Sequence, residues 1–175
     1  MIRYGLILLT ICLCASLVLS FTHKITQAKI EEQLSEGEKK ALDEVFPEAN
    51  SFEDKDLNDK TYYVAKKDGQ DLGYVIKAEA KGYSSTIVMM VGFDKSGVIK
   101  GLEVLSQQET PGLGAKITEV KAGEGAPWFL RQFTGKKATD LNLTTIQAIT
   151  AATITSSAVI DSVKKSVEEF LERVK

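Results

Sequence analysis

The clearest hydrophobic pattern in the chain is an unbroken apolar run close to its amino terminus. Residues 4–21, YGLILLTICLCASLVLSF, contain no charged side chain, and Arg3 is the only charged side chain before them. A helix rises about 1.5 Å per residue, so this run spans roughly 27 Å, close to the thickness of a bilayer core. The pattern predicts a transmembrane anchor within residues 1–23.

A cleaved signal peptide is the alternative interpretation of the same run, with Arg3 as its basic start and residues 18–20 as a passable cleavage site. The run is longer than the hydrophobic region of most signal peptides, which favours a retained anchor. Arg3 on a short leading tail favours export of the remaining chain, although Lys24 and Lys29 weaken the charge asymmetry. We therefore expect a single-pass protein of the inner (cytoplasmic) membrane, with its soluble part on the outer, periplasmic side.

A more polar helical pattern follows the run and covers residues 24–47. Pro47 ends it, because the proline ring blocks continuation of a helix. We interpret this segment as a stalk that lifts an exported domain, residues 48–175, off the membrane, and the acid-rich residues 51–59 (SFEDKDLND) as a surface loop. The apolar residues of the stalk that fall on one rough stripe are Ile30, Leu34, Leu42 and Val45.

The middle of the chain carries the patterns of β-strands. Residues 74–81 alternate between apolar and polar positions, and residues 86–93 (TIVMMVGF) are apolar on both faces, as in a buried central strand. The turn-forming residues 94–97 separate that strand from residues 98–105, so a hairpin is expected there. With a shorter β-rich stretch at 61–66 and no alternating βαβ pattern, the sequence predicts an α+β domain with a small, mainly antiparallel sheet packed with helices.

Two helical patterns complete the domain. Residues 127–133 (PWFLRQF) predict a short helix whose aromatic side chains belong to the core rather than to a cofactor site. The last helix is expected to begin near Thr155 or Ser156, which are good N-caps. A helix N-terminus carries unpaired N–H groups and a partial positive charge, so this one could receive a phosphate. The hydroxyls of TAATITSS (150–157) would be further donors to that phosphate. The alternative is that these hydroxyls only cap the helix. The apolar stripe of the helix consists of Ile160, Val163, Val167, Phe170, Leu171 and Val174.

The stretch QQETPGLG, residues 107–114, is a loop with an unusual set of residues. Pro111 fixes its own φ, while Gly112 and Gly114 permit positive φ. Such a loop can bring backbone close to a flat ligand. An ordinary tight connection is the alternative, and both interpretations fit these residues.

Charge and residue content exclude several kinds of chemistry. The net charge is −2, so the chain lacks the electrostatic footprint of a nucleic-acid-binding protein. His23 is the only histidine and lies beside the apolar run, which excludes a histidine-based triad and a histidine metal cluster. Both cysteines, Cys12 and Cys14, fall within the run, so the predicted exported domain has no thiol for a metal site or a disulfide. These patterns define a membrane-anchored α+β domain that could hold a phosphorylated ligand.

The segment ITAATITSSAV, residues 149–159, resembles the flavinylation signature of the FMN-binding domain family. In that signature an Asp is followed after two positions by Ser or Thr, Gly, Ala and Thr, and the final Thr bears FMN through a phosphoester bond to its hydroxyl. This sequence departs from the signature twice, with Gln147 in place of the acid and Ala151 in place of the glycine. The matching positions are Gln147, Thr150, Ala151, Ala152 and Thr153.

Three further features resemble the G subunit of the Rnf ion-translocating ferredoxin:NAD oxidoreductase complex: the ETPGLG loop at 109–114, the PWFLRQF segment and the single N-terminal anchor. The resemblance covers nearly the whole chain. It implies an electron-transfer subunit that is not an enzyme on its own, with FMN joined covalently to Thr153 by a separate flavin transferase and with the other Rnf subunits as partners. The residues that it places around the flavin are Glu109, Thr110, Gly112, Leu113, Gly114, Thr150, Ala151, Ala152, Thr155 and Ser156.

Two alternatives to this function remain open. The C subunit of the sodium-pumping NADH:quinone reductase is related, but its chains are typically longer than 175 residues. A non-redox membrane-anchored module for binding or assembly, with a signature that has decayed, is the second alternative. The presence or absence of covalent flavin separates the redox from the non-redox interpretation.

Overall fold

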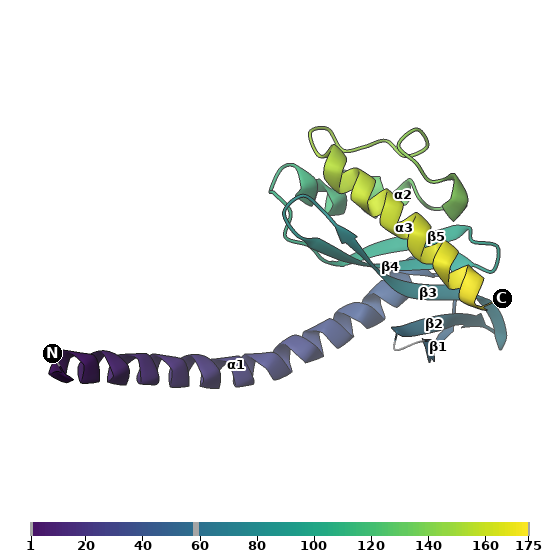
Figure 1. The fold of residues 1–175 in the computed structure, drawn as a ribbon. Helices are drawn as coiled ribbons and strands as arrows, with labels where there is room; N and C mark the ends of the chain where they lie inside the picture. Colours follow the sequence, from purple (N-terminus) through teal and green to yellow (C-terminus); the bar gives the residue numbers. More distant parts are fainter. Residues whose placement is uncertain (1, 58–59, 175) are drawn as a thin grey trace. The chain divides into compact units, whose positions relative to one another are not determined.

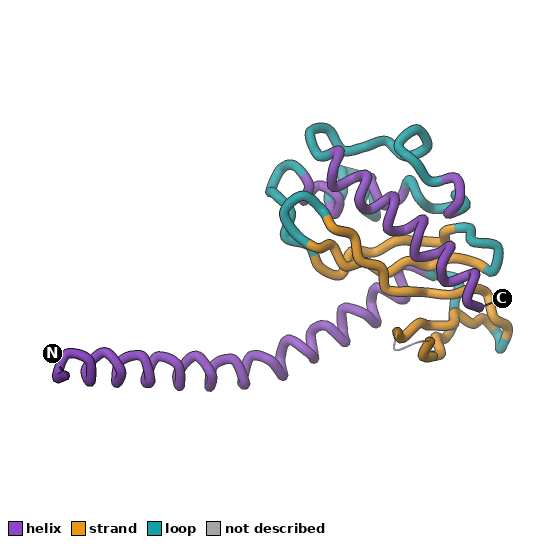
Figure 2. Tube along the Cα trace, viewed as in Figure 1, coloured by secondary structure: helices purple, strands orange, loops and turns teal. Residues whose placement is uncertain are grey.

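The computed structural model describes the backbone of residues 2–57 and 60–174. The chain divides into two compact units, Met1–Gly37 and Glu38–Lys175. A long helix, α1 (Ile2–Val45), belongs to both and ends two residues before Pro47. In chain order, the remaining elements are β1 (Ser51–Leu57), β2 (Lys60–Lys67), β3 (Gln70–Lys81), β4 (Thr86–Asp94), β5 (Ile99–Ser106), η1 (Gly114–Thr118), α2 (Trp128–Arg131), η2 (Ala138–Asp140) and α3 (Thr153–Val174), as Figures 1 and 2 show.

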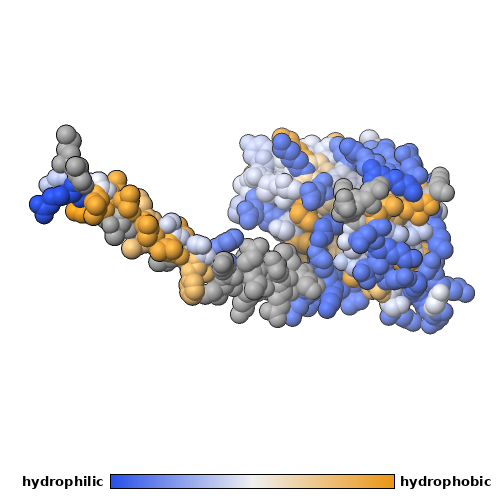
Figure 3. Space-filling view, turned by 60° about the horizontal axis from the view of Figure 1, so that its bottom comes forward, coloured by the Kyte–Doolittle hydropathy of each residue, from blue (hydrophilic) through white to orange (hydrophobic). Residues whose placement is uncertain are grey.

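The first unit consists of helix α1 as far as Gly37. Within the described residues, its segment Arg3–His23 is the one helical stretch long and apolar enough to cross a membrane. Apolar side chains such as Leu8, Leu9 and Leu17 are exposed, and Figure 3 shows a hydrophobic surface along this part of the helix. These properties are those of the predicted anchor, and a signal sequence would share them. The side chains of Ile30 and Leu34, on the predicted stripe of the stalk, lie outside the described ones.

The second unit is built on a five-stranded antiparallel sheet in the order β1-β2-β3-β4-β5. Strand β4 lies between β3 and β5 and is buried on both faces, as predicted for residues 86–93. The strands predicted at 61–66, 74–81 and 98–105 are also confirmed, with slightly different ends. The predicted fold class, an antiparallel sheet packed with helices, is therefore correct.

The prediction of a surface loop at 51–59 is wrong in its larger part, because Ser51–Leu57 form strand β1, while residues 58 and 59 lie outside the described ones. Strand β1 is the edge of the sheet, so both of its faces are largely exposed and its acidic side chains remain in water. Its backbone pairs with β2, and the Glu53 carboxylate forms an ion pair with Lys66. An exposed edge strand of this kind lacks the apolar alternation from which strands are predicted.

Both faces of the sheet are covered by helices. Helix α3 lies across one face (Figure 1), where Ile76, Ala78 and Ala80 of β3 are buried, as their alternation predicts. The end of α1 covers the other face, and its Leu42 and Val45 belong to a second buried cluster there. The last turns of α1, assigned from the sequence to a stalk, thus pack in the core of the folded domain.

The end of α1 approaches the sheet at two glycines. Gly92 of β4 and Gly101 of β5 are cross-strand partners. A Cβ atom at Gly92 would lie 2.4 Å from the Val45 side chain, and one at Gly101 would lie 2.6 Å from the Val45 carbonyl oxygen. Real Cβ atoms do not approach other atoms so closely, so this packing requires glycine at both positions.

The two predicted helical patterns after the sheet are also present. Helix α2 covers part of the 127–133 segment, and its Phe129, together with Phe133, is fully buried, which confirms that these aromatic residues are core residues. Most of the predicted stripe of α3 is buried, whereas Val174 is exposed at the end of the helix. The buried residues of the stripe are Ile160, Val163, Val167 and Phe170.

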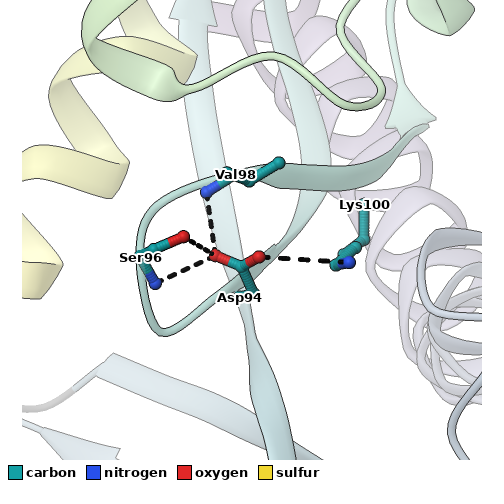
Figure 4. Close-up of polar contacts among 4 residues, drawn as sticks. All are labelled: Asp94, Ser96, Val98 and Lys100. Carbon is teal, nitrogen blue, oxygen red and sulfur yellow. Dashed lines mark hydrogen bonds and ion pairs between the residues drawn. The ribbon is translucent and has the colours of Figure 1, made fainter.

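The predicted turn at 94–97 is fixed by the Asp94 side chain (Figure 4). Its Oδ1 accepts hydrogen bonds from the Ser96 N–H at 2.9 Å, the Ser96 hydroxyl at 2.6 Å and the Val98 N–H at 3.0 Å. Burial opposes the charge on this carboxylate, but the hydrogen bonds and Lys100 outweigh burial and hold the Asp94 pKa below its usual value. The turn closes with Gly97 at φ +83° and leads into β5.

Candidate functional site

The two unusual segments of the sequence meet at one open cleft in the second unit. The loop that follows β5 forms one wall, and the start of α3 forms another. The volume of the cleft is about 440 Å³, which is within the range of small-molecule sites. Its lining residues are Tyr83, Glu109, Thr110, Leu113, Gly114, Ala151, Ala152, Thr153, Ile154 and Thr155.

The Glu109 carboxylate holds the turn between β3 and β4 against the cleft. One of its oxygens, Oε1, accepts the N–H of Ser84 at 2.9 Å, the N–H of Ser85 at 2.8 Å and the Ser85 hydroxyl at 3.2 Å. The other, Oε2, accepts the N–H of Tyr83 at 3.2 Å. Glu109 is only 5% exposed, so its charge is stabilised by these donors instead of by water.

The same carboxylate also joins the loop to α3. The Thr155 hydroxyl donates to Glu109 Oε2 at 2.7 Å, and both groups are buried. A Cβ atom at Gly82 would lie 2.6 Å from one Glu109 oxygen, and a Cβ at Gly114 would lie 2.5 Å from the other. Gly114 does not have the positive φ that its sequence context allowed; close approach to Glu109 is what requires glycine there. Gly112 does have positive φ, at +76°.

The ionisation of Glu109 follows from these contacts. Burial raises its pKa, but the hydrogen bonds from Thr155, Ser84 and Ser85 together outweigh burial and bring the pKa below the usual value. The carboxylate is therefore charged at neutral pH, and its lone pairs are used in bonds within the protein. It is better suited to hold the walls of the cleft together than to act as a base or to contact a ligand directly.

Helix α3 begins two residues earlier than predicted, at Thr153. Its first turn closes with a hydrogen bond from the Ser156 N–H to the Ala152 carbonyl at 3.0 Å. Thr155 and Ser156 are consequently inside the helix, and the prediction that they are its N-caps is wrong. The Thr155 hydroxyl makes a tertiary contact with Glu109 instead, and the Ser156 hydroxyl donates to the Ala152 carbonyl and accepts the Ile149 N–H just before the helix.

This start leaves Thr153 available at the cleft wall. Its side chain is exposed, and among the described residues neither its hydroxyl nor the N–H groups of Thr153, Ile154 and Thr155 have a hydrogen-bond partner. Unpaired N–H groups at a helix N-terminus attract phosphate. None of the described residues that line the cleft is a lysine, arginine or histidine, so these N–H groups are the main positive feature of the cleft.

Most of the residues proposed from the sequence lie at the cleft, and three do not line it. Thr150 is exposed before the helix, Gly112 is exposed in the loop, and Ser156 is fully buried beneath the helix start. Gln147, in the position of the signature acid, is also exposed, and its backbone exchanges two hydrogen bonds with the Gln132 side chain.

Two lining residues were missed in the sequence, Tyr83 and Ile154. They are unusually exposed for large side chains, at 71% and 59%, and with Leu113 they form an apolar rim around the cleft. Ile154 follows Thr153 directly in the sequence, so its position at the cleft could have been predicted from the signature. Tyr83 comes from the GYSS turn after β3, and hydrogen bonds with the loop that follows β5, chiefly those to Glu109, hold that turn at the site.

Ala151, which replaces the glycine of the flavinylation signature, has a strained backbone conformation. Ala151 has φ +61°, in the left-handed region that glycine adopts without a steric penalty. For a residue with a Cβ atom this conformation costs about 1–2 kcal/mol. The structure therefore explains why a glycine suits this position, and it places the strain directly before the helix start that carries Thr153.

We expect Ala151→Gly to stabilise the domain by about 0.5–1 kcal/mol. The substitution removes the left-handed strain, and the larger entropy of glycine in the unfolded chain offsets part of the gain. Urea unfolding of the full-length chain in detergent measures the change. Ala158→Gly, inside α3, is the matched control and should destabilise by about 1 kcal/mol. A loss of stability at position 151 would show that the strain is absent.

Comparison with protein families agrees with the geometry of the cleft. Residues 82–168 match the FMN-binding domain family, and residues 1–45 match the RnfG N-terminal region. The first match contains all the residues that line the cleft, and the second contains the whole of α1. The sheet, the cleft and this match define the second unit as an FMN-binding domain.

Relatives of known assignment extend over nearly the whole chain. The G subunit of the Na(+)-translocating ferredoxin:NAD(+) oxidoreductase complex of Acetobacterium woodii is 32% identical, over 96% of this chain and 90% of its own length. The proton-translocating counterpart of Clostridium ljungdahlii is 32% identical over 90% of this chain and 85% of its own length. The G subunit of the ion-translocating oxidoreductase complex of Methanosarcina acetivorans is 33% identical over 88% and 86%. This chain belongs to the family of G subunits of ion-translocating oxidoreductase complexes.

Two solved structures share the fold. NqrC of Shewanella oneidensis superimposes with a TM-score of 0.55 at 22% identity, over 66% of this chain and 62% of that one. The C subunit of the Na(+)-translocating NADH-quinone reductase of Parabacteroides distasonis gives a TM-score of 0.52 at 24% identity, over 66% and 63%. This chain thus spans less than two thirds of either structure, and at these identities the likeness concerns the fold alone.

Proposed function

We propose that this chain is the FMN-carrying electron-transfer subunit of an ion-translocating ferredoxin:NAD oxidoreductase complex, and that the Thr153 hydroxyl holds the FMN through a phosphoester. The observation that supports the attachment site is the position of Thr153. It lies at the start of α3, with an exposed hydroxyl at the wall of the cleft and beside unpaired helix N–H groups. Family membership supports the flavin and the complex.

The residues of the cleft fit a phosphorylated, largely flat ligand. The helix N-terminus suits the phosphate, and Tyr83, Leu113 and Ile154 offer apolar surface to a ring system. No cationic side chain lines the described cleft, so non-covalent binding of a phosphate would depend on N–H groups and hydroxyls alone. A covalent bond overcomes this weakness, because the ligand then cannot dissociate from an exported domain.

None of the described residues that line the cleft is suited to be the base that attachment requires. A threonine hydroxyl is a weak nucleophile until a base removes its proton. Glu109 is the one carboxylate among the described lining residues, and its low pKa and its five hydrogen bonds make it a poor base. A separate flavin transferase is therefore proposed to supply the base and an activated flavin pyrophosphate. The Thr153 oxygen would form a new bond to the flavin-side phosphorus, and the P–O bond of the pyrophosphate bridge would break. The second phosphate would leave together with the group attached to it, and the hydroxyl proton would pass to the base of the transferase.

When bound, the flavin supplies the redox chemistry, and the protein supplies its position and surroundings. Thr153 fixes the phosphate end at α3. Glu109 keeps the turn with Tyr83, the loop with Leu113 and the start of α3 together, so the walls of the cleft do not separate. Tyr83, Leu113 and Ile154 limit the contact of the ring with water, which influences the reduction potential.

The apolar helix supports the proposed membrane location, and Arg3 before that helix supports the proposed side. The Arg3–His23 helix anchors the protein in the inner membrane, and the FMN-binding domain lies on the outer side. The other subunits of the complex are its partners for electron transfer and assembly. The protein passes electrons within the assembly and does not turn over a substrate by itself.

Co-expression with a flavin transferase tests this proposal. The full-length protein should gain the mass of one FMN less one water, give a fluorescent band after denaturation, and purify with the other subunits of the complex. A protein without added mass beside an active transferase would favour the non-redox alternative and would show that Gln147 and Ala151 have disabled the signature. A flavinylated protein that purifies with the components of a sodium-pumping NADH:quinone reductase would favour the other alternative.

A further inference from the structure

Strand β3 is accompanied by β2 along only part of its length. The register between β2 and β3 ends at the pair Tyr62–Ile76, whereas the pairing of β3 with β4 continues to Lys81–Thr86. Figure 1 shows β1 and β2 beside only one end of the longer β3. Residues 77–81 of β3 therefore form an edge, although β3 is an inner strand of the sheet.

The direction of the backbone groups on this edge can be derived from two contacts. The Gly82 N–H donates to the Ser85 carbonyl at 2.9 Å, so the backbone groups of Gly82 point toward the chain of β4. Backbone groups alternate in direction along a strand, so those of Lys81 and Glu79 point away from β4. The Ser162 hydroxyl donates to the Glu79 carbonyl from that outer side, at 2.8 Å. Among the described residues, the Glu79 N–H and both backbone groups of Lys81 have no partner.

The space beside this edge has room for another strand. A groove with an empty volume of about 1350 Å³, including space open to solvent, lies beside the first part of this edge and is lined there by Lys77, Ala78 and Glu79. Thr61 of β2 lies where the neighbouring strand departs, and Ser162 and Ser166 of α3 border one side, while Glu38 of α1 borders another. An extended segment in this groove would take the position that β2 has left and would satisfy the free backbone groups.

We propose that residues 77–81 of β3 accept an extended segment from another protein of the complex as an added strand. Side chains that alternate in charge, Lys77, Glu79 and Lys81, follow the edge, and Lys77 is already paired with Glu38. The occupant therefore carries a basic residue opposite Glu79 and an acidic residue opposite Lys81, since opposite charges stabilise cross-strand pairs. That the occupant belongs to the same complex rests on the function proposed above.

This edge also leads to the flavin cleft. Lys81 is followed by the turn that contributes Tyr83 to the lining, so a strand paired along β3 ends close to the apolar rim of the cleft. Docking here would bring the backbone of the partner beside the proposed flavin. The inference thus gives this protein an assembly contact next to its redox site.

Hydrogen exchange in the full-length chain, alone in detergent and within the purified complex, tests the proposal. The Glu79 and Lys81 amides should exchange at least about tenfold more slowly in the complex, while Gly123 and Gly125 in an exposed loop should not change. If the chain purifies with the complex but both amides exchange at equal rates, the docking inference fails and the proposed function stands. If the chain never joins the complex, both fail.

Substitutions at Glu79 distinguish the contribution of its backbone N–H to docking from the contribution of its side-chain charge. Glu79→Pro removes an N–H that points away from β4, so it should reduce recovery of the complex several-fold. Flavin loading should not change, because proline is tolerated on strand edges and the domain should still fold. Glu79→Ala keeps the N–H and should lower recovery less. Full recovery with Glu79→Pro, or protection of these amides in self-associated chain without partners, would overturn the proposal. If Glu79→Pro does not fold, the exchange measurement still decides.

Discussion

Thr153→Ala should abolish the covalent flavin completely while the domain remains folded. The substitution removes the oxygen that forms the proposed phosphoester. The side chain is exposed and has no hydrogen-bond partner among the described residues, so its loss should change the stability by less than about 0.5 kcal/mol. In-gel flavin fluorescence and intact mass, after co-expression with the transferase, measure the loss, and circular dichroism checks the fold.

Two matched variants make this result specific. Thr153→Ser keeps a hydroxyl at the same position and should retain covalent flavin. Thr150→Ala removes an exposed hydroxyl that lies near in sequence but does not line the cleft, so flavin loading should continue. Covalent flavin in Thr153→Ala would place the attachment site elsewhere. Thr155→Ala should act differently from both, by destabilising the domain, because Glu109 would lose its donor at 2.7 Å.

Glu109→Gln should destabilise the domain by about 2–4 kcal/mol at neutral pH and lower flavin loading. The carboxylate accepts from backbone N–H groups on both of its oxygens, and the glutamine amide would turn a donor toward one set of them. Hydrogen bonds to a buried charged group contribute about 1.5–3 kcal/mol each, and the donors left without a partner add to the cost. Urea unfolding of the full-length chain measures the difference.

The pH dependence of this difference has a defined sign. The pKa of Glu109 is lower in the folded state than in the unfolded state, where it is near 4.5. Its contribution to stability is therefore fully present above that value and is lost as the pH falls through the lower folded-state pKa. The gap between wild type and Glu109→Gln should narrow in acid. Glu119→Gln, at an exposed position, is the control and should have only a small effect on stability. A gap that stays constant down to about pH 3 would contradict the assigned role.

Patterns that depend on local physics were readable in the sequence. The apolar run, the alternation in β3, the two-sided apolar β4 and the stripe of α3 each follow from the period of a single element and its burial. The helix stop before Pro47 also follows from the covalent geometry of one residue, and the positive φ of Gly112 is one that the covalent geometry of glycine permits. The signature at Thr153 indicated the flavin through resemblance, without any knowledge of neighbours in space.

The tertiary structure decided the features that depend on contacts between distant segments. The strand nature of Ser51–Leu57 depends on pairing with β2, because its own residues carry no apolar alternation. Helix α3 starts at Thr153, and the Thr155 hydroxyl, which the sequence offered as a cap, is used inside the helix in a contact with the distant Glu109. Such contacts have no local period from which they could be predicted.

The cleft itself is the strongest example. Glu109 was a candidate through the resemblance of its loop to the family. Its role as the common acceptor for the Tyr83–Ser85 turn and for Thr155 required the fold to bring three separate segments together. The effect of Ala151 likewise depended on its φ, which the sequence left undetermined between an allowed and a strained value. The sequence by itself thus determined most of the elements, and it proposed Thr153 as the attachment position through resemblance. Only the packed structure decided which side chains surround that position, because the buried carboxylate is stable there solely when all of its donors are in place.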